Sequence, residues 1–388
     1  MHFSRLLSTS LMAALVTGHP GHDHSQELNA RLEFLANNKN DLSHCAEKML
    51  ARGLDAANSR RRSDLAGQLL KKRGLEVRDI ASYTDSHKSS AKFTAETDLA
   101  TVFAGNSSCA LSPEQVEGPY YVAGERIRKD VTETQQGVPL AVDIQVVDMV
   151  TCDPIPGAYL EIWHCNATGI YGGVVAGGNG NNQDKSNLNN TMLRGAQKTD
   201  KDGAVQFHTI FPGHYTGRTT HIHVAVHLKA VAQANGTLLD TTAAHVGQMY
   251  FDQDLITEVE KNAPYTANKQ PLTTNAQDFI LTGAAGSSDP VMEYVVLGKG
   301  VADGLLSWLS FGINTTLARE ISPAVTGCDM PLYETGGEAN PNAGMGGPGG
   351  FPTGFPSGFP TGFPSGFPSG FPFPPGATPP AQTGVPKN

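Results

Sequence analysis

Two histidines that flank a single residue, His221 and His223, are candidate metal ligands. They lie in residues 219–228, where polar and apolar side chains alternate as in a β-strand, so both imidazoles are expected on one face. Such a pair can bind one metal ion, but a half-exposed strand can also carry it without any ligand role. Further ligands must therefore come from other segments of the chain.

Two tyrosines near predicted strand ends, Tyr171 and Tyr215, are candidate oxygen ligands. A neutral phenol is a poor ligand, but a phenolate is a hard anionic oxygen that suits ferric iron, and the cation itself promotes loss of the proton. Two phenolates and two imidazoles would neutralise much of the charge on Fe(III) and keep it oxidised. Each tyrosine could instead be a packing aromatic. Arg218 would place a cation beside this site, or form a loop salt bridge.

Short strands separated by turns are expected to position these side chains. Alternation or apolar runs predict strands at residues 140–149 (half-buried), 158–163, 204–211, 219–228, 247–251 and 291–297. Turns are expected at residues 154–157 and 200–203, and a flexible Gly- and Asn-rich loop at residues 173–182. Strands at this spacing predict a mainly β fold with an antiparallel β-sandwich core. Residues 106–335 are assigned to this sandwich, as the catalytic domain.

The segment before the sandwich is predicted to be helical. Leu28, Leu32 and Leu35 fall at helical spacing, and the pattern continues in broken form to about residue 75. Basic clusters at residues 60–62 and 71–73 favour a charged, solvated helix face over a dibasic site for removal of a pro-segment. Residues 19–105 are therefore assigned to a helical segment followed by a linker, and the helical part could form a homodimer.

The first 18 residues resemble a signal peptide, because Arg5 precedes an apolar stretch that ends in small residues. Five Asn-x-Ser/Thr sequons agree with export and predict a glycoprotein, at Asn106, Asn166, Asn189, Asn235 and Asn314. We therefore expect the protein to be secreted. His19, His22 and His24 follow the leader and could bind copper or zinc, although a solvated terminus is favoured.

The five cysteines predict disulfides in an exported chain, with one thiol left over. Cys152 and Cys165 flank a strand-like run and are the expected pair. Two of Cys45, Cys109 and Cys328 are expected to pair, and their spacing leaves open which two. The sequence contains no Cys-x-x-Cys motif, so a thiolate zinc site is not expected.

The C-terminal segment, residues 336–388, is rich in Gly, Pro and Phe and includes five Phe-Pro-Ser/Thr-Gly tetrads. Such a tract cannot build a core, so it is predicted to be a disordered tail, with attachment to a cell surface as a further hypothesis. The formal net charge of −9 argues against binding to nucleic acid. After the leader, no apolar run approaches the roughly 20 residues of a membrane span.

The segment from residue 117 to residue 251 resembles the intradiol ring-cleavage dioxygenases, which open catechols between the two hydroxyl-bearing carbons. The family motifs correspond to Gly118-Pro119-Tyr120-Tyr121, Gly157-Ala158 with Trp163-His164, Gly169-Ile170-Tyr171, Arg194-Gly195, Thr199-Asp200 with Gly203, Pro212 with Tyr215, Arg218 with His221 and His223, and Gln248 with Tyr250-Phe251. The leader and the cysteines make the chain most similar to the secreted branch of the family. Only five residues separate Tyr215 from His221, and this short loop predicts an open substrate pocket.

The resemblance implies a non-haem Fe(III) centre whose ligands are Tyr171, Tyr215, His221 and His223. A small aromatic diol would bind through both oxygens and react with O2, and the product would be a muconate-type diacid. The family pattern also implies that Tyr215 takes a substrate proton and that Arg218 stabilises the developing negative charge.

The same resemblance implies that Gln248 helps to hold the reacting oxygen, although a hydrogen bond at a strand edge is an equal alternative for this residue. Three other histidines of this region, His164, His214 and His227, are not expected to be ligands. Two other functions are open. The sandwich could be an inactive binding module at the cell surface, or the histidines could bind copper or zinc, a hypothesis that two phenolates disfavour.

Overall fold

The computed structural model describes residues 42–75, 108–109, 118–181, 183–240, 242–278, 280–282, 289–321, 323, 325–326 and 338–339. All of them belong to the first of two compact units, Met1–Gly347, and the second, Pro348–Asn388, lies outside the described residues. The predicted signal peptide, the N-terminal histidines, Asn106 and Cys328 lie outside them as well.

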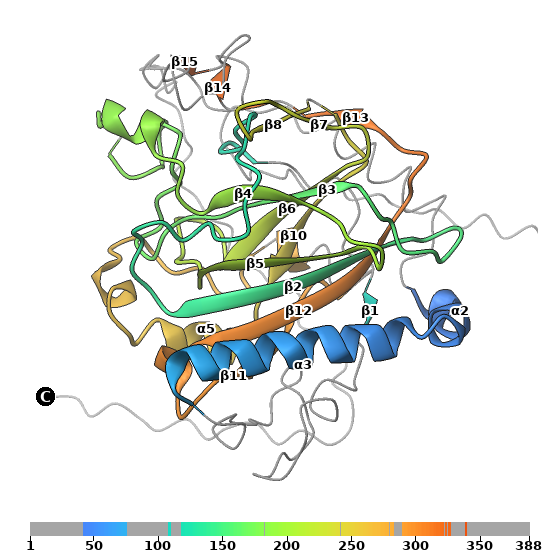
Figure 1. Cartoon of the computed structure of the whole chain (residues 1–388). Helices are drawn as coiled ribbons and strands as arrows, with labels where there is room; N and C mark the ends of the chain where they lie inside the picture. Colours follow the sequence, from blue (N-terminus) through green and yellow to red (C-terminus); the bar gives the residue numbers. More distant parts are fainter. Residues whose placement is uncertain are drawn as a thin grey trace, which may run out of the picture. The chain divides into compact units, whose positions relative to one another are not determined.

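Two β-sheets form the core of the described part (Figure 1). The first sheet has the order β1 (Ser108–Cys109), β12 (Leu305–Ile313), β2 (Pro139–Asp148), β5 (Ala204–Ile210), and β11 (Glu293–Val296) also pairs with β12. The second sheet has the order β10 (His245–Tyr250), β6 (His221–His227), β3 (Tyr159–Trp163), β4 (Arg194–Lys198). The mainly β sandwich is confirmed. All pairs of the second sheet are antiparallel, whereas β12 runs parallel to β2, so the first sheet is mixed.

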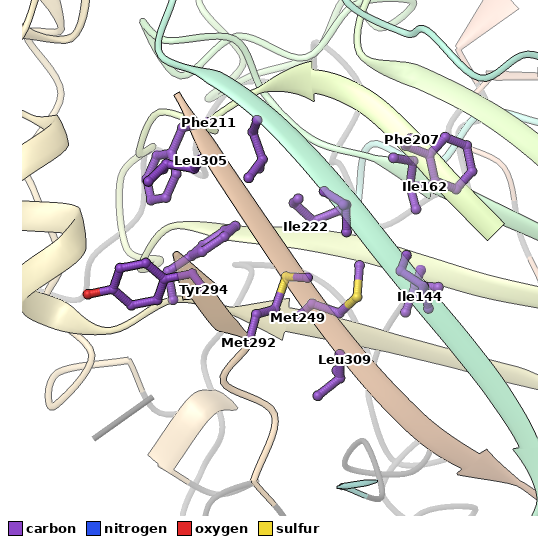
Figure 2. Close-up of a cluster of buried hydrophobic side chains, with 14 of the residues drawn as sticks. Ile144, Ile162, Phe207, Phe211, Ile222, Met249, Met292, Tyr294, Leu305 and Leu309 are labelled. Carbon is purple, nitrogen blue, oxygen red and sulfur yellow. The ribbon is translucent and has the colours of Figure 1, made fainter. Parts of the chain in front are cut away.

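The apolar faces of the two sheets pack on each other (Figure 2). Ile144 and Leu309 of the first sheet and Ile162, Ile222 and Met249 of the second belong to one buried cluster. Each such side chain contributes about 1.5–3 kcal/mol when it is removed from water. Because side chains alternate along a strand, the burial of Ile222 in this core turns both neighbours, His221 and His223, to the opposite face of the second sheet.

Strand β2 is buried along both faces, which corrects the expectation of a half-buried strand. The reason is helix α3 (Leu54–Arg73), which runs along the first sheet (Figure 1) and packs Leu65 and Leu69 against Ala141 and Trp308. Strand β12 was not predicted from the sequence, for the same reason. A strand covered on both sides needs no alternation, so its sequence is an apolar run interrupted by serines.

Arg61 and Arg62 dock α3 on this sheet, which corrects the expectation of a solvated helix face for these two residues, whereas Arg60, Lys71 and Lys72 are exposed as expected. Arg61 donates from Nε and Nη2 to Asp143 at 2.8 Å, and the fully buried Arg62 donates to the same carboxylate at 3.2 Å. Asn58 donates to Gln145 at 2.7 Å.

The disulfide links Cys45 to Cys152, with the two Cα atoms 5.3 Å apart, so the predicted Cys152–Cys165 pair is wrong. Cys152 follows β2 and lies in a small cluster with Cys45 and Met49, at the end of α2 (Ala46–Ala51). Cys165 follows β3, in the other sheet, where its buried thiol donates to the carbonyl of Gly213. Proximity in the sequence misled because consecutive strands belong to opposite sheets. The expected pairing of Cys45 with Cys109 or Cys328 is excluded by the same disulfide.

Shorter elements complete the described residues: η1 (Ser43–Cys45), η3 (Lys185–Asn189), β7 (Val231–Ala232), β8 (Leu238–Leu239), β9 (Thr242–Ala243), α5 (Gln253–Val259), η4 (Tyr265–Ala267), η5 (Val301–Asp303), β13 (Arg319–Glu320), β14 (Val325–Thr326) and β15 (Glu338–Ala339). Strand β15 pairs with β14, so at this point the segment predicted to be disordered is a strand instead. Among the described residues, no helix combines the length and the apolar character that a membrane span requires.

Candidate active site

The four predicted metal ligands lie together on the outer face of the second sheet. The Nε2 atoms of His221 and His223 are 3.1 Å apart. The ring centroid of Tyr215 is 5.6 Å from that of His221, and the ring of Tyr171 is 5.6 Å from Tyr215 and 6.1 Å from His223. All four side chains are buried. Segments far apart in the sequence thus place two imidazole nitrogens and two phenol rings around one point.

The ring of His221 is held with its Nε2 facing the cluster. Its Nδ1 lies 2.6 Å from the carbonyl oxygen of Thr219, to which it donates, so Nε2 carries the lone pair. Burial, with a further contribution from Arg218, lowers the pKa of His221 to about 3, so this ring is neutral and able to coordinate a cation.

The ring of His223 stacks on the indole of Trp163, with centroids 4.8 Å apart and planes 6° apart. On its edge lies Gly118, whose φ of +77° favours glycine. A Cβ atom at this position would lie 3.1 Å from Cε1 of His223. The Gly-Pro-Tyr-Tyr motif and the strand ending in Trp163 therefore both fix the orientation of this imidazole.

Tyr171 is positioned by a loop that the sequence analysis expected to be flexible. The side chain of Asn179 accepts from the backbone N–H of Tyr171 at 2.7 Å and donates to its carbonyl at 2.9 Å. Asn187 donates to the same carbonyl at 2.9 Å. Both asparagines are buried, so the loop is anchored at the point where it presents the phenol.

The hydroxyl groups of the two tyrosines lie near each other in buried surroundings. Among the described residues, the buried Tyr171 hydroxyl makes no hydrogen bond of regular geometry, although it is near enough to Tyr215 to lower the pKa of that residue slightly. Burial dominates, however. It raises the pKa of Tyr215 to about 12 and that of Tyr171 well above its ordinary value. Both phenols stay protonated unless a cation draws off the proton.

This donor set fits ferric iron. Two buried imidazoles and two buried phenols offer hard oxygen and nitrogen ligands, and a trivalent cation would supply the charge that ionises the phenols. Among the described residues, His44, Cys45 and Cys152 also lie close together, but the two sulfurs form the disulfide and cannot bind a metal.

A buried cation, Arg218, lies next to the cluster. Its Nε donates to Asp278 at 2.9 Å, and its Nη2 donates to Gln248 at 2.5 Å and to the hydroxyl of Tyr250 at 3.1 Å. Burial disfavours the charge, but Tyr250, Tyr215 and Asp278 outweigh it and raise the pKa of Arg218 above its ordinary value. Both expectations for Arg218 therefore hold: it forms a salt bridge, with Asp278, and it lies beside the predicted metal ligands.

Gln248 lies on the site face of the sheet. In the register of β10 with β6, Gln248 is opposite His223 and Tyr250 is opposite His221. The Oε1 atom of Gln248 accepts from Arg218 and, at 2.6 Å, from Tyr250. Its Nε2 is buried and has no hydrogen-bond partner among the described residues.

Residues 116–277 match the sequence model of a protein family described as Dioxygenase. The chain belongs to the intradiol ring-cleavage dioxygenase family. It is 33% identical over 109 residues to catechol 1,2-dioxygenase 1 of Acinetobacter lwoffii, a match that covers 27% of this chain and 32% of the relative. With catechol 1,2-dioxygenase of Pseudomonas sp. (strain EST1001), the identity is 32% over the same shares of the two chains. The chain thus spans about a third of the length of the curated relatives it matches.

Solved structures of dioxygenases are also similar in sequence. An intradiol ring-cleavage dioxygenase from Tetranychus urticae is 34% identical, over 53% of this chain and 95% of that chain, with a TM-score of 0.43. The dioxygenase domain of a dioxygenase carbohydrate-binding protein fusion from Streptomyces sp. SirexAA-E is 24% identical, over 54% and 98% of the two chains, with a TM-score of 0.32.

The dioxygenase match contains all six predicted site residues, but it ends one residue before Asp278. Asp278 was missed in the sequence analysis, because it lies 60 positions after Arg218 in a polar segment that carries no family motif. Its position before the apolar residues 279–281 is typical of a helix N-cap, and that signal points to a structural role only. Tyr250 was quoted within a motif but given no role.

Three further histidines of the dioxygenase segment, His164, His214 and His227, have protein partners at both ring nitrogens. His164 bonds to the Cys165 carbonyl and to Thr209, both at 2.8 Å. His214 bonds to Glu260 and to the carbonyl of Gln270, and His227 to Glu161 and to the carbonyl of Thr242. These nitrogens are engaged by other elements of the fold, whereas Nε2 of His221 and Nε2 of His223 face each other at 3.1 Å.

Proposed function

We propose that this protein is a non-haem Fe(III) dioxygenase that cleaves catechol-type diols between their two hydroxyl-bearing carbons with O2, giving muconate-type diacids. The observation that carries the proposal is the convergence of Tyr171, Tyr215, His221 and His223 in one buried cluster. The similarity to proteins named catechol 1,2-dioxygenase supports the class of substrate. No observation favours an inactive binding module, because every residue of the cluster is present and buried.

Ferric iron held by these four side chains would supply a Lewis acid that binds both diol oxygens and prepares the ring for direct reaction with O2. The protein contributes aromatic rings around the site. The ring of Tyr120 lies 4.7 Å from Tyr171 and 5.9 Å from Tyr215, and Trp163 covers His223. These rings exclude water from one side of the site and strengthen the electrostatic interactions within it.

Tyr215 is the proposed base for the diol. Because burial raises the pKa of Tyr215 to about 12, its phenolate binds a proton strongly once it is free of the cation. We expect Oη of Tyr215 to accept the proton of one diol hydroxyl. Arg218 then faces the negative charge that develops during the reaction, and the Nε2 group of Gln248 is the donor available to a reacting oxygen.

We also propose that the protein acts outside the cell as a glycoprotein. The predicted signal peptide supports this, and so does the Cys45–Cys152 disulfide, since such bonds persist in oxidising compartments. The sequon residues Asn189 and Asn235 are exposed and could carry glycans. A homodimer stays a prediction. The apolar side chains of α3 pack on the first sheet of the same chain.

Metal analysis and oxygen uptake test the proposed activity together. Purified protein should contain one iron per chain, show the visible charge-transfer absorption of an iron tyrosinate, and consume O2 with at least one member of a panel of catechols. Tyr215→Phe and His221→Gln should lose both absorption and activity. Tyr159→Phe and His208→Gln, which change the same residue types at partly exposed positions outside the cluster, should keep both. A colourless protein with stoichiometric zinc, or activity that survives both cluster variants, would exclude the proposed function.

A further inference from the structure

The guanidinium of Arg218 is fixed by a carboxylate that is itself rigidly held. One oxygen of Asp278 accepts from Nε of Arg218 at 2.9 Å and from the backbone N–H of Thr219 at 2.8 Å. The other oxygen accepts from the N–H groups of Ile280 and Leu281, at 2.9 and 3.0 Å. The Asp278 side chain is fully buried. Three backbone donors therefore determine where this carboxylate lies, independently of the arginine that it binds.

The bond to Asp278 also determines which edge of Arg218 faces the site. With Nε engaged by the carboxylate, Nη2 is directed to Gln248 and Tyr250. Tyr250 in turn donates to the same Oε1 atom of Gln248 that Arg218 binds. Two donors on Oε1 set the orientation of the amide, because the reverse orientation would place its NH2 group against both of them.

The consequence is a hydrogen-bond donor directed away from this network. Nε2 of Gln248 is buried and has no partner among the described residues, and Gln248 shares the sheet face of His221 and His223. A buried donor without a partner costs free energy, because it has lost its bonds to water. The fold bears this cost at a position where a reacting oxygen could accept the bond.

We propose that Asp278 is a positioning residue for the ring-cleavage reaction: it orients Arg218, and through Arg218 the amide of Gln248, so that Nε2 is presented to the bound substrate. The inference rests on the proposed function. It goes beyond the family pattern, since the family match ends at residue 277. The Asp278 carboxylate accepts its hydrogen bonds from Arg218 and from the backbone N–H groups of Thr219, Ile280 and Leu281. Its contribution is the rigid carboxylate from which the chain of hydrogen bonds starts.

Asp278→Asn tests this role, because the amide keeps the size of the side chain and removes its charge. We expect kcat to fall about 10–100-fold, as for a donor displaced from its reacting partner, while iron content and the tyrosinate absorption stay at the wild-type values. Asp143→Asn is the matched control. Asp143 is equally buried and binds two arginines on the far side of the sandwich, so this variant should lose thermal stability and keep kcat.

A double variant separates positioning from general destabilisation. In an Arg218→Gln background, Asp278→Asn should change kcat less than twofold, because the residue it acts through is gone. If Asp278→Asn proves too unstable to purify, Tyr250→Phe keeps the ring and removes one donor to Oε1, and it should lower kcat with iron content unchanged.

Three results would overturn the inference: wild-type kcat in Asp278→Asn, an undiminished effect of that change in the Arg218→Gln background, or an equal loss of kcat in Asp143→Asn. Wild-type protein that binds iron and shows the tyrosinate absorption, yet consumes no O2 with any catechol, would instead refute the proposed function, and the inference with it.

Discussion

Two buried carboxylates bind arginine on opposite sides of this molecule, and they differ in what surrounds them. Under α3, Asp143 binds Arg61 and Arg62. The neighbouring Gln145 uses both ends of its amide. Its Oε1 accepts from Asn58 and Ser310, and its Nε2 donates to a carbonyl of the turn between β4 and β5. In the candidate active site, Asp278 binds Arg218, and the neighbouring Gln248 uses only its oxygen. Buried ion pairs hold elements together in both places, but only the second leaves polar atoms open to a ligand.

The buried polar groups in these two places have different roles, structural under α3 and functional in the candidate active site. A buried amide that is fully hydrogen-bonded can stabilise and specify packing, as at Gln145. In the described part of the chain, Nε2 of Gln248 has no hydrogen-bond partner and the Tyr171 hydroxyl makes no bond of regular geometry, and a buried polar group in this state costs free energy. Such a cost at adjacent side chains is understandable where a metal ion and a substrate complete the bonds.

The largest expected effect is the loss of a metal ligand on the active-site side. Tyr171→Phe removes the hydroxyl that lacks a partner and leaves the ring packing in place. We expect the visible absorption to disappear and kcat to fall by about 10³-fold or more, because the Lewis acid is no longer held. Metal content, absorption and O2 uptake measure this. Full colour and activity in the variant would show that Tyr171 is a packing residue. The buried polar groups of the candidate active site would then not differ in role from those under α3.

On the α3 side, Asp143→Ala should affect stability and leave catalysis unchanged. The change leaves the fully buried Arg62 without its carboxylate, and a broken buried pair costs about 3–5 kcal/mol. Urea unfolding of the variant and of wild-type protein gives the difference in free energy. The kcat of the folded variant, normalised to bound iron, should match that of wild type. A fall in this normalised kcat would mean that the two sides are coupled.

Removal of the disulfide is expected to act in the same way. Cys45 and Cys152 join segments 107 residues apart, and loss of such a bond costs about 2–5 kcal/mol. The double variant Cys45→Ala/Cys152→Ala should unfold at lower urea concentration and keep its normalised kcat. A reducing agent should lower the midpoint of wild-type protein to that of the double variant and have no effect on the variant itself. An equal response of both proteins to the reductant would point to a different disulfide.

A matched pair of hydroxyl deletions sharpens the comparison between the two glutamines. Tyr250 donates to Oε1 of Gln248, and Ser310 donates to Oε1 of Gln145. Each deletion removes one hydrogen bond worth about 1 kcal/mol. Tyr250→Phe should therefore lower kcat about fivefold, whereas Ser310→Ala should lower the free energy of unfolding and leave kcat unchanged. Steady-state kinetics and urea unfolding of both variants distinguish the outcomes, and equal kinetic effects would contradict the division.

The smallest expected effect is a loss of stability that appears only at acidic pH. Burial alone would raise the pKa of Asp143, but Arg61 and Arg62 hold it below its ordinary value in the folded protein. This stabilisation is therefore fully present above the unfolded pKa of about 3.9 and is lost as the pH falls through the lower folded pKa. Urea midpoints measured from neutral pH down to that range should fall for wild type and less steeply for Asp143→Asn. Parallel curves would exclude Asp143 as the group responsible.

Much of the second sheet could be predicted because one of its faces is covered by the core and the other by polar or aromatic side chains. Strand β6 alternates for this reason, and its alternation correctly placed His221 and His223 on one face. The first sheet was harder. Strands β2 and β12 are buried on both faces, by the core and by α3. The sequence of β12 therefore shows no alternation of polar and apolar residues that would predict a strand. The same cover reversed the expected role of Arg61 and Arg62.

By itself, the sequence determined the mainly β fold, the candidate ligand types and their motif order, since alternation and local spacing follow directly from backbone geometry. Only the tertiary structure decided that Cys152 pairs with Cys45, that α3 docks through Asp143, and that Asp278 anchors Arg218. Each of these contacts joins residues at least 60 positions apart. Local physical rules do not determine such pairings, because which segments meet depends on how the sheets stack and which face each strand presents.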